Sequence, residues 1–561
     1  MPSSLDSYRL FVGLVFAVSV FLLVDAWMRD RQHPEPPPST PAGQALRQTP
    51  TPSLGTPAPQ TAQQGKPADN APAPVTEGPL PKGQRVRVQT DFLVAEIDTH
   101  GGDLRHVELL LHKDRGDKDR SFVLFQEDPP RVYVARSGLI QGQGLADHNT
   151  VFAVDGTSFE LAPGEDSLVV RLAAPVNAHA KVVKTYTFHR SSYVIDVGFE
   201  VTNFDGTPAE PYAYFQLVRD INPPEGDSRL VPTYTGAEVY TEKDKLHKVS
   251  FSDIEANKGS YPKSATDGWL AFVQHYFLSA WVLPQGTPRD YFLKPLTAGL
   301  VGGGVITPLG KIEPKQTAKV EAKLYAGPQE QERLKALAPG LELTIDYGWL
   351  RVLAVPLFWV LNEIHSVVGN WGVAIIILTV LIKLVFYPLS AASYKSMARM
   401  KVLAPKLQRL KERYGDDRQK MHEAMIELYK TEKINPLGGC LPIVVQIPVF
   451  IALYWVLLLS VELRHAPFIL WINDLSAPDP YFILPVLMGA TMFIQTWLNP
   501  TPPDPMQAKL MKIMPIAFSV FFFFFPSGLV LYWLVNNVLS IAQQWRITHV
   551  LERAKTAHDG N

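Results

Sequence analysis

One lysine lies inside an otherwise apolar stretch of the chain. Residues 371–389 read WGVAIIILTVLIKLVFYPL, and Lys383 is their one charged side chain. A helix of about 19 residues spans the roughly 30 Å hydrocarbon core of a bilayer, where an ammonium costs about 2.5–3.5 kcal/mol. The Lys383 stem either snorkels to the nearer interface or the ammonium faces a polar cavity. Thr379, one turn earlier on the same face, favours the cavity.

Single polar side chains recur in the later apolar runs. Gln446 and Gln495 lie in separate runs, and Tyr532, Asn536 and Gln543 share one face of another. Amides in hydrocarbon are costly unless they face one another or water. No Asp or Glu lies deep in these runs. The pattern therefore predicts a hydrated pocket or groove rather than a proton relay.

Other patterns that carry chemistry are few. Cys440 is the one cysteine, so the chain can form neither an internal disulfide nor a paired-cysteine metal site. Neither a Gly-x-Ser-x-Gly motif nor a dinucleotide fingerprint occurs. Gly302-Gly303-Gly304 lacks the strand–helix context of a phosphate loop, and a turn is predicted there. The net charge of −1 gives no support for a nucleic-acid partner.

The amino-terminal part divides into an apolar run and a proline-rich segment. Residues 10–27 are apolar, and no cleavage site of A-x-A type follows them directly. Residues 1–29 are therefore predicted to be an uncleaved transmembrane signal anchor rather than a signal peptide. Residues 34–81 hold fourteen prolines, a composition that cannot bury a core. An extended linker is predicted over residues 30–83.

Alternation of apolar and polar residues begins near residue 84. Residues 85–98 and 182–204 alternate in this way and are rich in Val, Tyr, Phe and Thr, as half-buried strands are. Turn clusters such as residues 100–103 separate the runs. Short strands without a long amphipathic helix predict an antiparallel β-sandwich over residues 84–340.

Helical patterning follows the predicted sandwich. Residues 341–370 include an amphipathic stretch that is predicted to lie in the membrane interface, with a linker helix packed on the sandwich as the alternative. Residues 371–549 then hold five apolar runs, at 371–389, 438–460, 481–498, 510–525 and 528–545. The predicted fold class is a multi-domain membrane protein. It combines an all-α polytopic core, six transmembrane helices of which five form the core, with an antiparallel β-sandwich.

The charges between the runs predict the topology. Residues 390–436 carry eleven Lys and Arg residues, whereas residues 461–480 carry one. The positive-inside rule places the first segment in the cytoplasm and the second outside. Both termini, including a short tail at residues 550–561, are then cytoplasmic, and the linker and the β-sandwich lie outside.

The basic segment has helical patterning of its own. Leu403 and Leu407 mark one apolar stripe, and Met421 and Met425 mark another after a Gly-Asp-Asp break. A helical hairpin over residues 390–436 is therefore predicted. Its stripes either pack on one another near anionic headgroups or form an adaptable surface that meets an incoming chain or a ribosome.

Long segments of the chain resemble a YidC-type membrane protein insertase of Gram-negative bacteria. The resemblance to the periplasmic domain of that family lies in GWLAFVQHYFLSAW (268–281) and LYAGP (324–328). The resemblance to its membrane core lies in NPLGGCLPIVVQIPVFIALYWVL (435–457), VELRHAPFILWINDLSAPDPYFILPVLMG (461–489) and FPSGLVLYW (525–533). It implies a periplasmic β-sandwich similar to sugar-mutarotase folds and five core helices around a hydrophilic groove.

The resemblance also implies which residues line the groove. Lys383 matches the position of its one positive residue, where many members carry arginine; lysine keeps the charge but lacks the five-donor fork. Thr379, Gln446, Trp471 and Tyr532 also match positions in or near the family's groove. Asn536, which shares a helical face with Tyr532, completes the predicted groove set.

The implied activity is insertion and folding of integral membrane proteins in the bacterial inner membrane. This is a physical process rather than enzyme catalysis, and it implies neither a cofactor nor a metal. The implied partners are nascent membrane proteins, the Sec translocon, the ribosome through the cytoplasmic loops, and membrane lipids. A channel or carrier and an anchored periplasmic sugar-processing enzyme are the alternatives.

Overall fold

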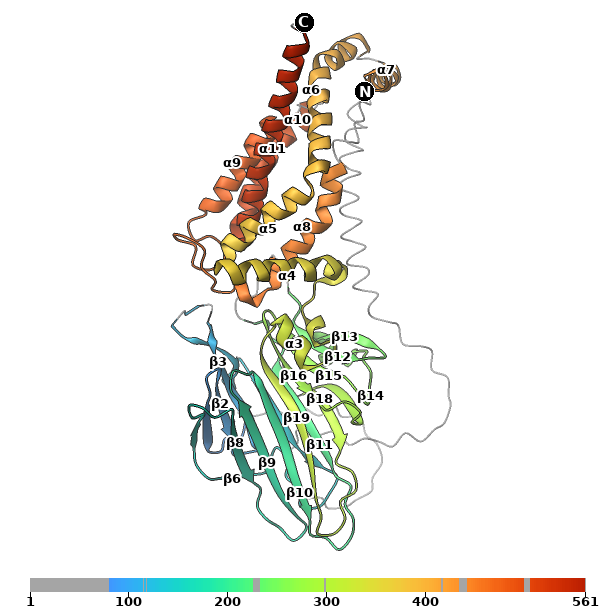
Figure 1. The fold of residues 1–561 in the computed structure, drawn as a ribbon. Helices are drawn as coiled ribbons and strands as arrows, with labels where there is room; N and C mark the ends of the chain where they lie inside the picture. Colours follow the sequence, from blue (N-terminus) through green and yellow to red (C-terminus); the bar gives the residue numbers. More distant parts are fainter. Residues whose placement is uncertain are drawn as a thin grey trace, which may run out of the picture. The chain divides into compact units, whose positions relative to one another are not determined.

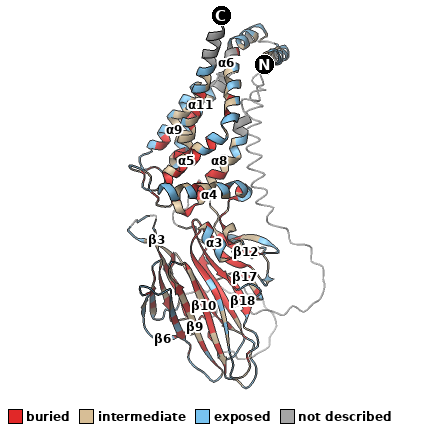
Figure 2. Ribbon diagram, viewed as in Figure 1, coloured by how far each residue is buried: buried red, intermediate tan, exposed pale blue. Residues whose placement is uncertain are grey.

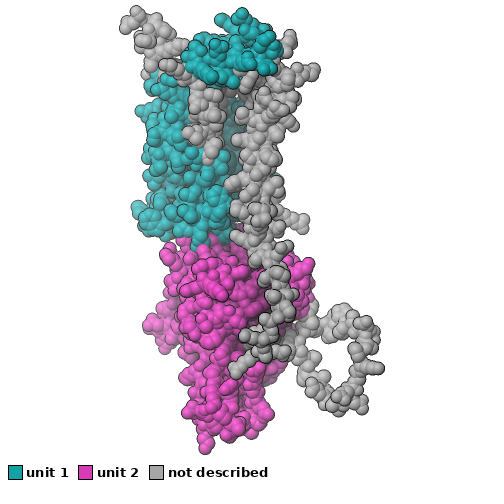
Figure 3. Space-filling model, turned by 90° about the vertical axis from the view of Figure 1, so that its right-hand side faces the viewer, with its two compact units in different colours: residues 1–31, 346–561 teal, residues 32–345 magenta. Residues whose placement is uncertain are grey.

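The computed structural model describes residues 80–559, apart from 115, 118, 225–232, 297–298, 415–416, 433–440 and 499–504. The predicted signal anchor, nearly all of the linker and Cys440 lie outside these residues. The described chain forms two compact units that meet in sequence between Ile345 and Asp346 (Figure 3). One unit is built of strands and the other of helices (Figure 1).

The β unit consists of two sheets. The first contains, in spatial order, β14 (Ser264–Ala265), β17 (Arg289–Pro295), β18 (Leu300–Pro308), β11 (Tyr212–Asp220), β5 (Tyr133–Ile140), β3 (Asp103–Lys113), β2 (Leu93–Asp98), β1 (Arg85–Gln89) and β7 (Ser158–Glu160), with β4 (Ser121–Phe125) beside β3. The second contains β13 (Lys245–Ser250), β12 (Gly236–Thr241), β15 (Trp269–Gln274), β16 (Phe277–Val282), β19 (Thr317–Pro328), β10 (Val194–Asn203), β9 (Ala180–His189), β8 (Ser167–Ala173) and β6 (Ala153–Val154). Two short helices, α2 (Phe251–Glu255) and α3 (Gln331–Leu337), complete the unit.

The core of the β unit lies between the sheets. Burial alternates along β9, which matches the alternation in its sequence, and Figure 2 shows buried residues along strands of both sheets. The rings of Phe215 on β11 and Trp281 on β16 lie 5.1 Å apart and join the two layers. This part of the chain is therefore a sandwich. Among the described strands, β1 and β7 form a parallel pair, whereas the other pairs are antiparallel.

The turn predicted at Gly302-Gly303-Gly304 is wrong. These residues lie in the buried interior of β18. A Cβ added to Gly304 would lie 2.3 Å from the carbonyl oxygen of Phe215 on neighbouring β11, and 2.8 Å from the Phe292 ring. Glycine is present because the strands and this ring approach closely, not because the chain turns.

The second unit contains eight longer helices among its described residues. They are α4 (Arg351–Val368), α5 (Trp371–Val385), α6 (Tyr387–Tyr414), α7 (Arg418–Thr431), α8 (Leu441–Leu459), α9 (Ile483–Leu498), α10 (Pro505–Phe521) and α11 (Ser527–Asp559). Helix α4 buries Ala354, Phe358 and Leu361 at helical spacing, whereas Val352 is 81% exposed, so the helix is amphipathic.

Length and hydropathy identify few of the described helices as membrane spans. The segment Gly348–Val368 meets both criteria by itself, and α5 with the first part of α6 meets them as a bent pair. The apolar stretches Val445–Leu459 and Ile483–Leu498 are shorter. The count of six transmembrane helices therefore stays a prediction.

The apolar run at 371–389 is not one straight helix. Helix α5 ends at Val385, and the chain bends by 67° before it continues as α6. Pro388 explains the break, because it has no N–H to donate to the carbonyl of Leu384 and its ring would clash with that carbonyl. The first turns of α6 are thereby directed across the end of α5.

Lys184 is buried inside the β unit. Its ammonium, on β9, donates hydrogen bonds to the carbonyl oxygens of Gly101 (3.1 Å) and Ser137 (3.0 Å). Burial lowers the pKa of Lys184 to about 8, although the Asp103 carboxylate acts in the opposite direction. The unfolded chain keeps an ordinary lysine pKa of about 10.4, so it binds more protons than the folded chain between about pH 8 and pH 10.

We expect the stability of the β unit to rise with pH across this window by up to about 3 kcal/mol, because the buried ammonium becomes neutral. Lys184→Met should abolish that part of the rise, since methionine does not titrate. Pulse proteolysis of the full-length protein in urea, from neutral pH to about pH 10, measures it. Lys181→Met, at an exposed position of the same strand, is the matched control. Equal slopes for K184M and the wild type would contradict the prediction.

Candidate functional site

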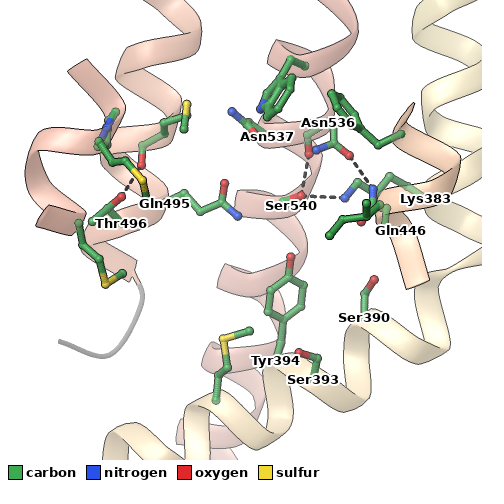
Figure 4. A pocket seen from close by; sticks show the side chains of 18 residues that line it. Lys383, Ser390, Ser393, Tyr394, Gln446, Gln495, Thr496, Asn536, Asn537 and Ser540 are labelled. Atoms are coloured by element: carbon green, nitrogen blue, oxygen red, sulfur yellow. Dashed lines mark hydrogen bonds between the residues drawn. The ribbon is translucent and has the colours of Figure 1, made fainter. Parts of the chain in front are cut away.

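The helical unit contains a cavity of about 450 Å³, lined by residues of α5, α6, α8, α9, α10 and α11. Ten of its lining residues are polar or charged, and Figure 4 labels them. They are Lys383, Ser390, Ser393, Tyr394, Gln446, Gln495, Thr496, Asn536, Asn537 and Ser540. The cavity therefore brings together polar side chains from helices that are far apart in sequence.

Lys383 contributes the positive charge of this cavity. The residue is 9% exposed, and its ammonium donates a hydrogen bond of 2.8 Å to the Ser540 hydroxyl on α11 (Figure 4). Among the described residues, no carboxylate lies within ion-pair distance of its Nζ. Of the two arrangements that the sequence left open, the structure has the ammonium on the cavity wall rather than extended along an apolar surface.

Two of the predicted amides face each other. The Gln446 side chain on α8 donates a hydrogen bond of 3.0 Å to the Asn536 side chain on α11. Both residues line the cavity. The pair satisfies one donor and one acceptor and leaves the remaining amide groups for the cavity. A polar contact thus ties two helices together beside Lys383.

The remaining lining residues are largely apolar. Eight belong to this group: Met397, Ile447, Phe450, Met492, Met511, Met514, Pro515 and Trp533. Four of them are methionines, whose unbranched and polarizable side chains adapt to ligands of varied shape. The cavity is therefore amphipathic. It offers a cation, amides and hydroxyls together with a deformable apolar surface.

Three predicted groove residues do not line the cavity. The Thr379 hydroxyl donates a 2.6 Å hydrogen bond to the Ile375 carbonyl, one turn earlier in its own helix. This bond satisfies the Thr379 hydroxyl within its own helix. The spacing of Thr379 from Lys383 therefore did not indicate a polar cavity. Tyr532 is 1% exposed, and its ring stacks on Phe450 at 5.8 Å between centroids.

The third of these residues, Trp471, belongs to the loop between α8 and α9. Its indole N–H donates a 2.9 Å hydrogen bond to the Asp479 carboxylate. That carboxylate also accepts the backbone N–H groups of Tyr481 (3.0 Å) and Leu484 (2.7 Å). Trp471 therefore orders this loop at the start of α9.

Sequence reasoning missed several polar residues of the cavity. Ser540 lies one turn after Asn536 on the same helical face, so its spacing contained a usable signal. Ser390, Ser393 and Tyr394 belong to the start of α6, which the sequence assigned to the cytoplasmic hairpin. The bend after α5 brings them to the cavity, and hydropathy does not report a bend.

The four residues predicted as the contact surface of the hairpin are not part of the cavity lining. Leu403 on α6 is buried, and Leu407, Met421 and Met425 are half-buried. Lys406 on α6 forms a 2.6 Å ion pair with Glu432, just after α7. The Asp417 side chain caps α7 by accepting the N–H of Lys420. Their role as a contact surface for a partner stays a prediction.

Metal chemistry has no candidate site in the described part of the chain. No three His, Cys, Asp or Glu side chains gather there in a way that could hold an ion.

Comparisons with known proteins cover both units. The family model described as "60Kd inner membrane protein" matches residues 363–555, and the model "YidC periplasmic domain" matches residues 85–360. A "Membrane protein insertase YidC" of Methylobacillus flagellatus is 54% identical over 559 residues, covering 99% of this chain and 100% of the relative. One of Nitrosospira multiformis is 53% identical, covering 98% of each. A solved structure, "Active YidC insertase crystal structure with the first transmembrane domain resolved", aligns at 20% identity and a TM-score of 0.38, covering 82% of this chain and 92% of that chain.

The amide pair makes a thermodynamic prediction. Gln446→Leu and Asn536→Leu should each destabilise the helical unit, because each leaves one amide without its partner. The double variant should lose less than the sum of the two, with a coupling of about 0.5–1.5 kcal/mol. The free energy of unfolding in mixed detergent micelles, measured for the wild type, both single variants and the double variant, gives this coupling. As a control, Gln446→Leu with Ser519→Ala should be additive, since Ser519 bonds to the Pro485 carbonyl instead. Additivity in the Gln446/Asn536 cycle would refute the coupling.

Proposed function

The chain belongs to the YidC family of membrane protein insertases, and on that premise we propose that it inserts membrane proteins through the cavity beside Lys383. One observation carries this proposal. A buried ammonium lies on the cavity wall, bonded to a neutral hydroxyl rather than to a carboxylate of the described chain. Its charge is therefore available to a substrate.

Charge attraction acts on the polar part of the substrate. An acidic side chain in a short translocated tail meets Lys383 in surroundings less polar than water. At about 4 Å and an effective dielectric constant of 20, the attraction is about 4 kcal/mol. The amides and hydroxyls of the cavity replace part of the water that the tail leaves behind. The polar tail thus crosses less hydrocarbon without hydrogen-bonding partners.

Apolar contact acts on the rest of the substrate. The methionine-rich wall of the cavity accepts side chains of different shapes, as a general insertase requires. The apolar segment then moves from this wall into lipid, where burial stabilises it by roughly 25 cal/mol per Å². No covalent bond forms or breaks, so the driving force is transfer of apolar surface out of water.

The topology proposed for this activity has six membrane spans. The anchor at residues 10–27 joins the five apolar runs of the helical unit, with both termini in the cytoplasm of the inner membrane. The excess of Lys and Arg in residues 390–436 supports a cytoplasmic hairpin and, with it, a periplasmic β unit. The amphipathic burial of α4 supports a position in the membrane interface.

Four kinds of partner follow from this arrangement. Nascent membrane proteins are the substrates, and lipids surround the helical unit. The basic hairpin is suited to a weak ribosome contact. Cooperation with the Sec translocon is proposed on family membership, and we propose no nucleic-acid site for this chain.

Lys383 supplies the direct test. Lys383→Ala should lower insertion of a substrate with an acidic tail by about tenfold, because part of a 4 kcal/mol attraction is screened by water in the cavity. A substrate whose tail carries Asn in place of Asp should insert nearly as before. Protease protection in proteoliposomes that contain the purified full-length protein measures both substrates.

Two further variants sharpen this test. Lys383→Arg retains the charge and should keep most of the preference for acidic tails, whereas Lys383→Glu should reverse it. If the alanine variant reduced both substrates equally, Lys383 would have a structural role and the proposal would fail.

Photocrosslinking tests where the substrate lies. A probe at Gln495, on the cavity wall, should crosslink to short ribosome-bound chains of a membrane protein. A probe at Trp497 on the same helix should crosslink weakly, because that residue is 83% exposed and is not part of the cavity lining. Equal crosslinking from both positions would place the substrate outside the cavity.

A further inference from the structure

The role proposed for Lys383 does not by itself explain the hydrogen bonds of Ser540. Ser540 is 4% exposed, lies on α11 and lines the cavity. Its hydroxyl donates a 2.7 Å hydrogen bond to the Asn536 carbonyl, one turn earlier, and accepts a 2.8 Å hydrogen bond from Lys383. A serine hydroxyl has one proton, and that proton is committed to the helix backbone. The oxygen therefore serves the ammonium as a hydrogen-bond acceptor.

The hydrogen bond to the Asn536 carbonyl also fixes the position of the Ser540 hydroxyl oxygen, which is the acceptor for Lys383. A hydroxyl that donates to the carbonyl four residues earlier is restrained in its χ1 angle. Asn536 in turn receives the Gln446 side chain at 3.0 Å. Three hydrogen bonds thus link α5, α11 and α8, as Figure 4 shows: Lys383 to Ser540, Ser540 to the backbone carbonyl of Asn536, and Gln446 to the side-chain oxygen of Asn536.

Lysine needs such an anchor. Its four-carbon stem has about 2 kcal/mol of rotamer entropy, and an unanchored ammonium extends toward water. Ser540 is the hydrogen-bond acceptor for Nζ within the described residues. The hydroxyl is neutral, so it leaves the charge uncompensated, whereas a carboxylate would neutralise it.

We propose that Ser540 is a positioning residue, which holds the Lys383 ammonium at the cavity wall until a substrate carboxylate replaces its hydroxyl as the acceptor. This inference rests on the proposed role of Lys383. The exchange is favourable because hydrogen bonds between ionised groups are roughly twice as strong as those to a neutral partner. Ser540 acts on charge recognition through Lys383 and does not itself select the substrate.

The readout is the ratio of insertion of acidic-tail to Asn-tail substrates, measured with the full-length protein in proteoliposomes. Ser540→Ala should lower this ratio by roughly fivefold to tenfold, which lies within the net contribution of a typical intramolecular hydrogen bond. Ser540→Cys should do the same, because a thiol of similar size is a weak acceptor. Ser540→Thr keeps the hydroxyl and its backbone bond, and should keep the ratio. A ratio removes the effect of lower folding yield, which acts on both substrates.

A matched control lies on the same helix. Thr548 donates a 2.9 Å hydrogen bond to the Gln544 carbonyl, four residues earlier, and is not part of the cavity lining. Thr548→Ala removes the same kind of bond and should leave the ratio unchanged. A lower ratio in this variant would assign the Ser540 effect to the helix backbone and overturn the inference.

Lys383→Ala in the same assay separates the two proposals. If it lowers the ratio while Ser540→Ala and Ser540→Cys do not, the positioning role is refuted and the function of Lys383 stands. If Ser540→Ala raises the ratio, the hydroxyl competes with substrate instead of positioning the ammonium, and the inference also fails. If Lys383→Ala leaves the ratio unchanged, charge recognition itself is refuted, and the role of Ser540 with it.

Discussion

The buried ammonium of Lys383 constrains the helices that the structure describes around it. An unpaired charge in an apolar interior is strongly destabilising, so polar groups have to surround it. Lys383 meets this requirement through Ser540, and the requirement extends from there to Asn536 and Gln446. Three helices are tied together by this one need, and the amphipathic cavity lies where they meet.

The bend between α5 and α6 also contributes to the polar surroundings of the Lys383 ammonium. The chain changes direction by 67° there, and Ser390, Ser393 and Tyr394 at the start of α6 line the same cavity as Lys383. Pro388, which cannot donate a backbone hydrogen bond, thus contributes to the polar environment of a side chain one turn away.

Periodicity predicted the elements of this protein better than their contacts. Alternation in residues 182–204 predicted strands, and β9 and β10 lie there. Periodicity could not show whether the three glycines at 302–304 form a turn or part of a strand. The reason for glycine there is the close approach of Phe292 and β11 to Gly304, which is a contact between different strands. In the site, the polar residues of separate apolar runs predicted a polar pocket, and Gln446 and Asn536 both line the cavity, although the sequence did not indicate that they pair. Helical spacing failed for Thr379, since a hydroxyl that bonds to its own helix has the same spacing as one that faces a cavity.

The choice of partner for the ammonium decides what the cavity can do. A carboxylate in place of Ser540 would compensate the charge and stabilise the unit, but breaking a buried ion pair costs about 3–5 kcal/mol, and an incoming acidic tail would have to supply it. The ammonium leaves a hydroxyl at a lower cost, because a hydrogen bond to a charged group contributes only about 1.5–3 kcal/mol net. The partly satisfied ammonium is therefore less stabilising for the folded protein and more attractive to a substrate. Under the role that we propose for Lys383, the site binds acidic segments transiently and requires that balance, whereas a site built for stability alone would not retain it.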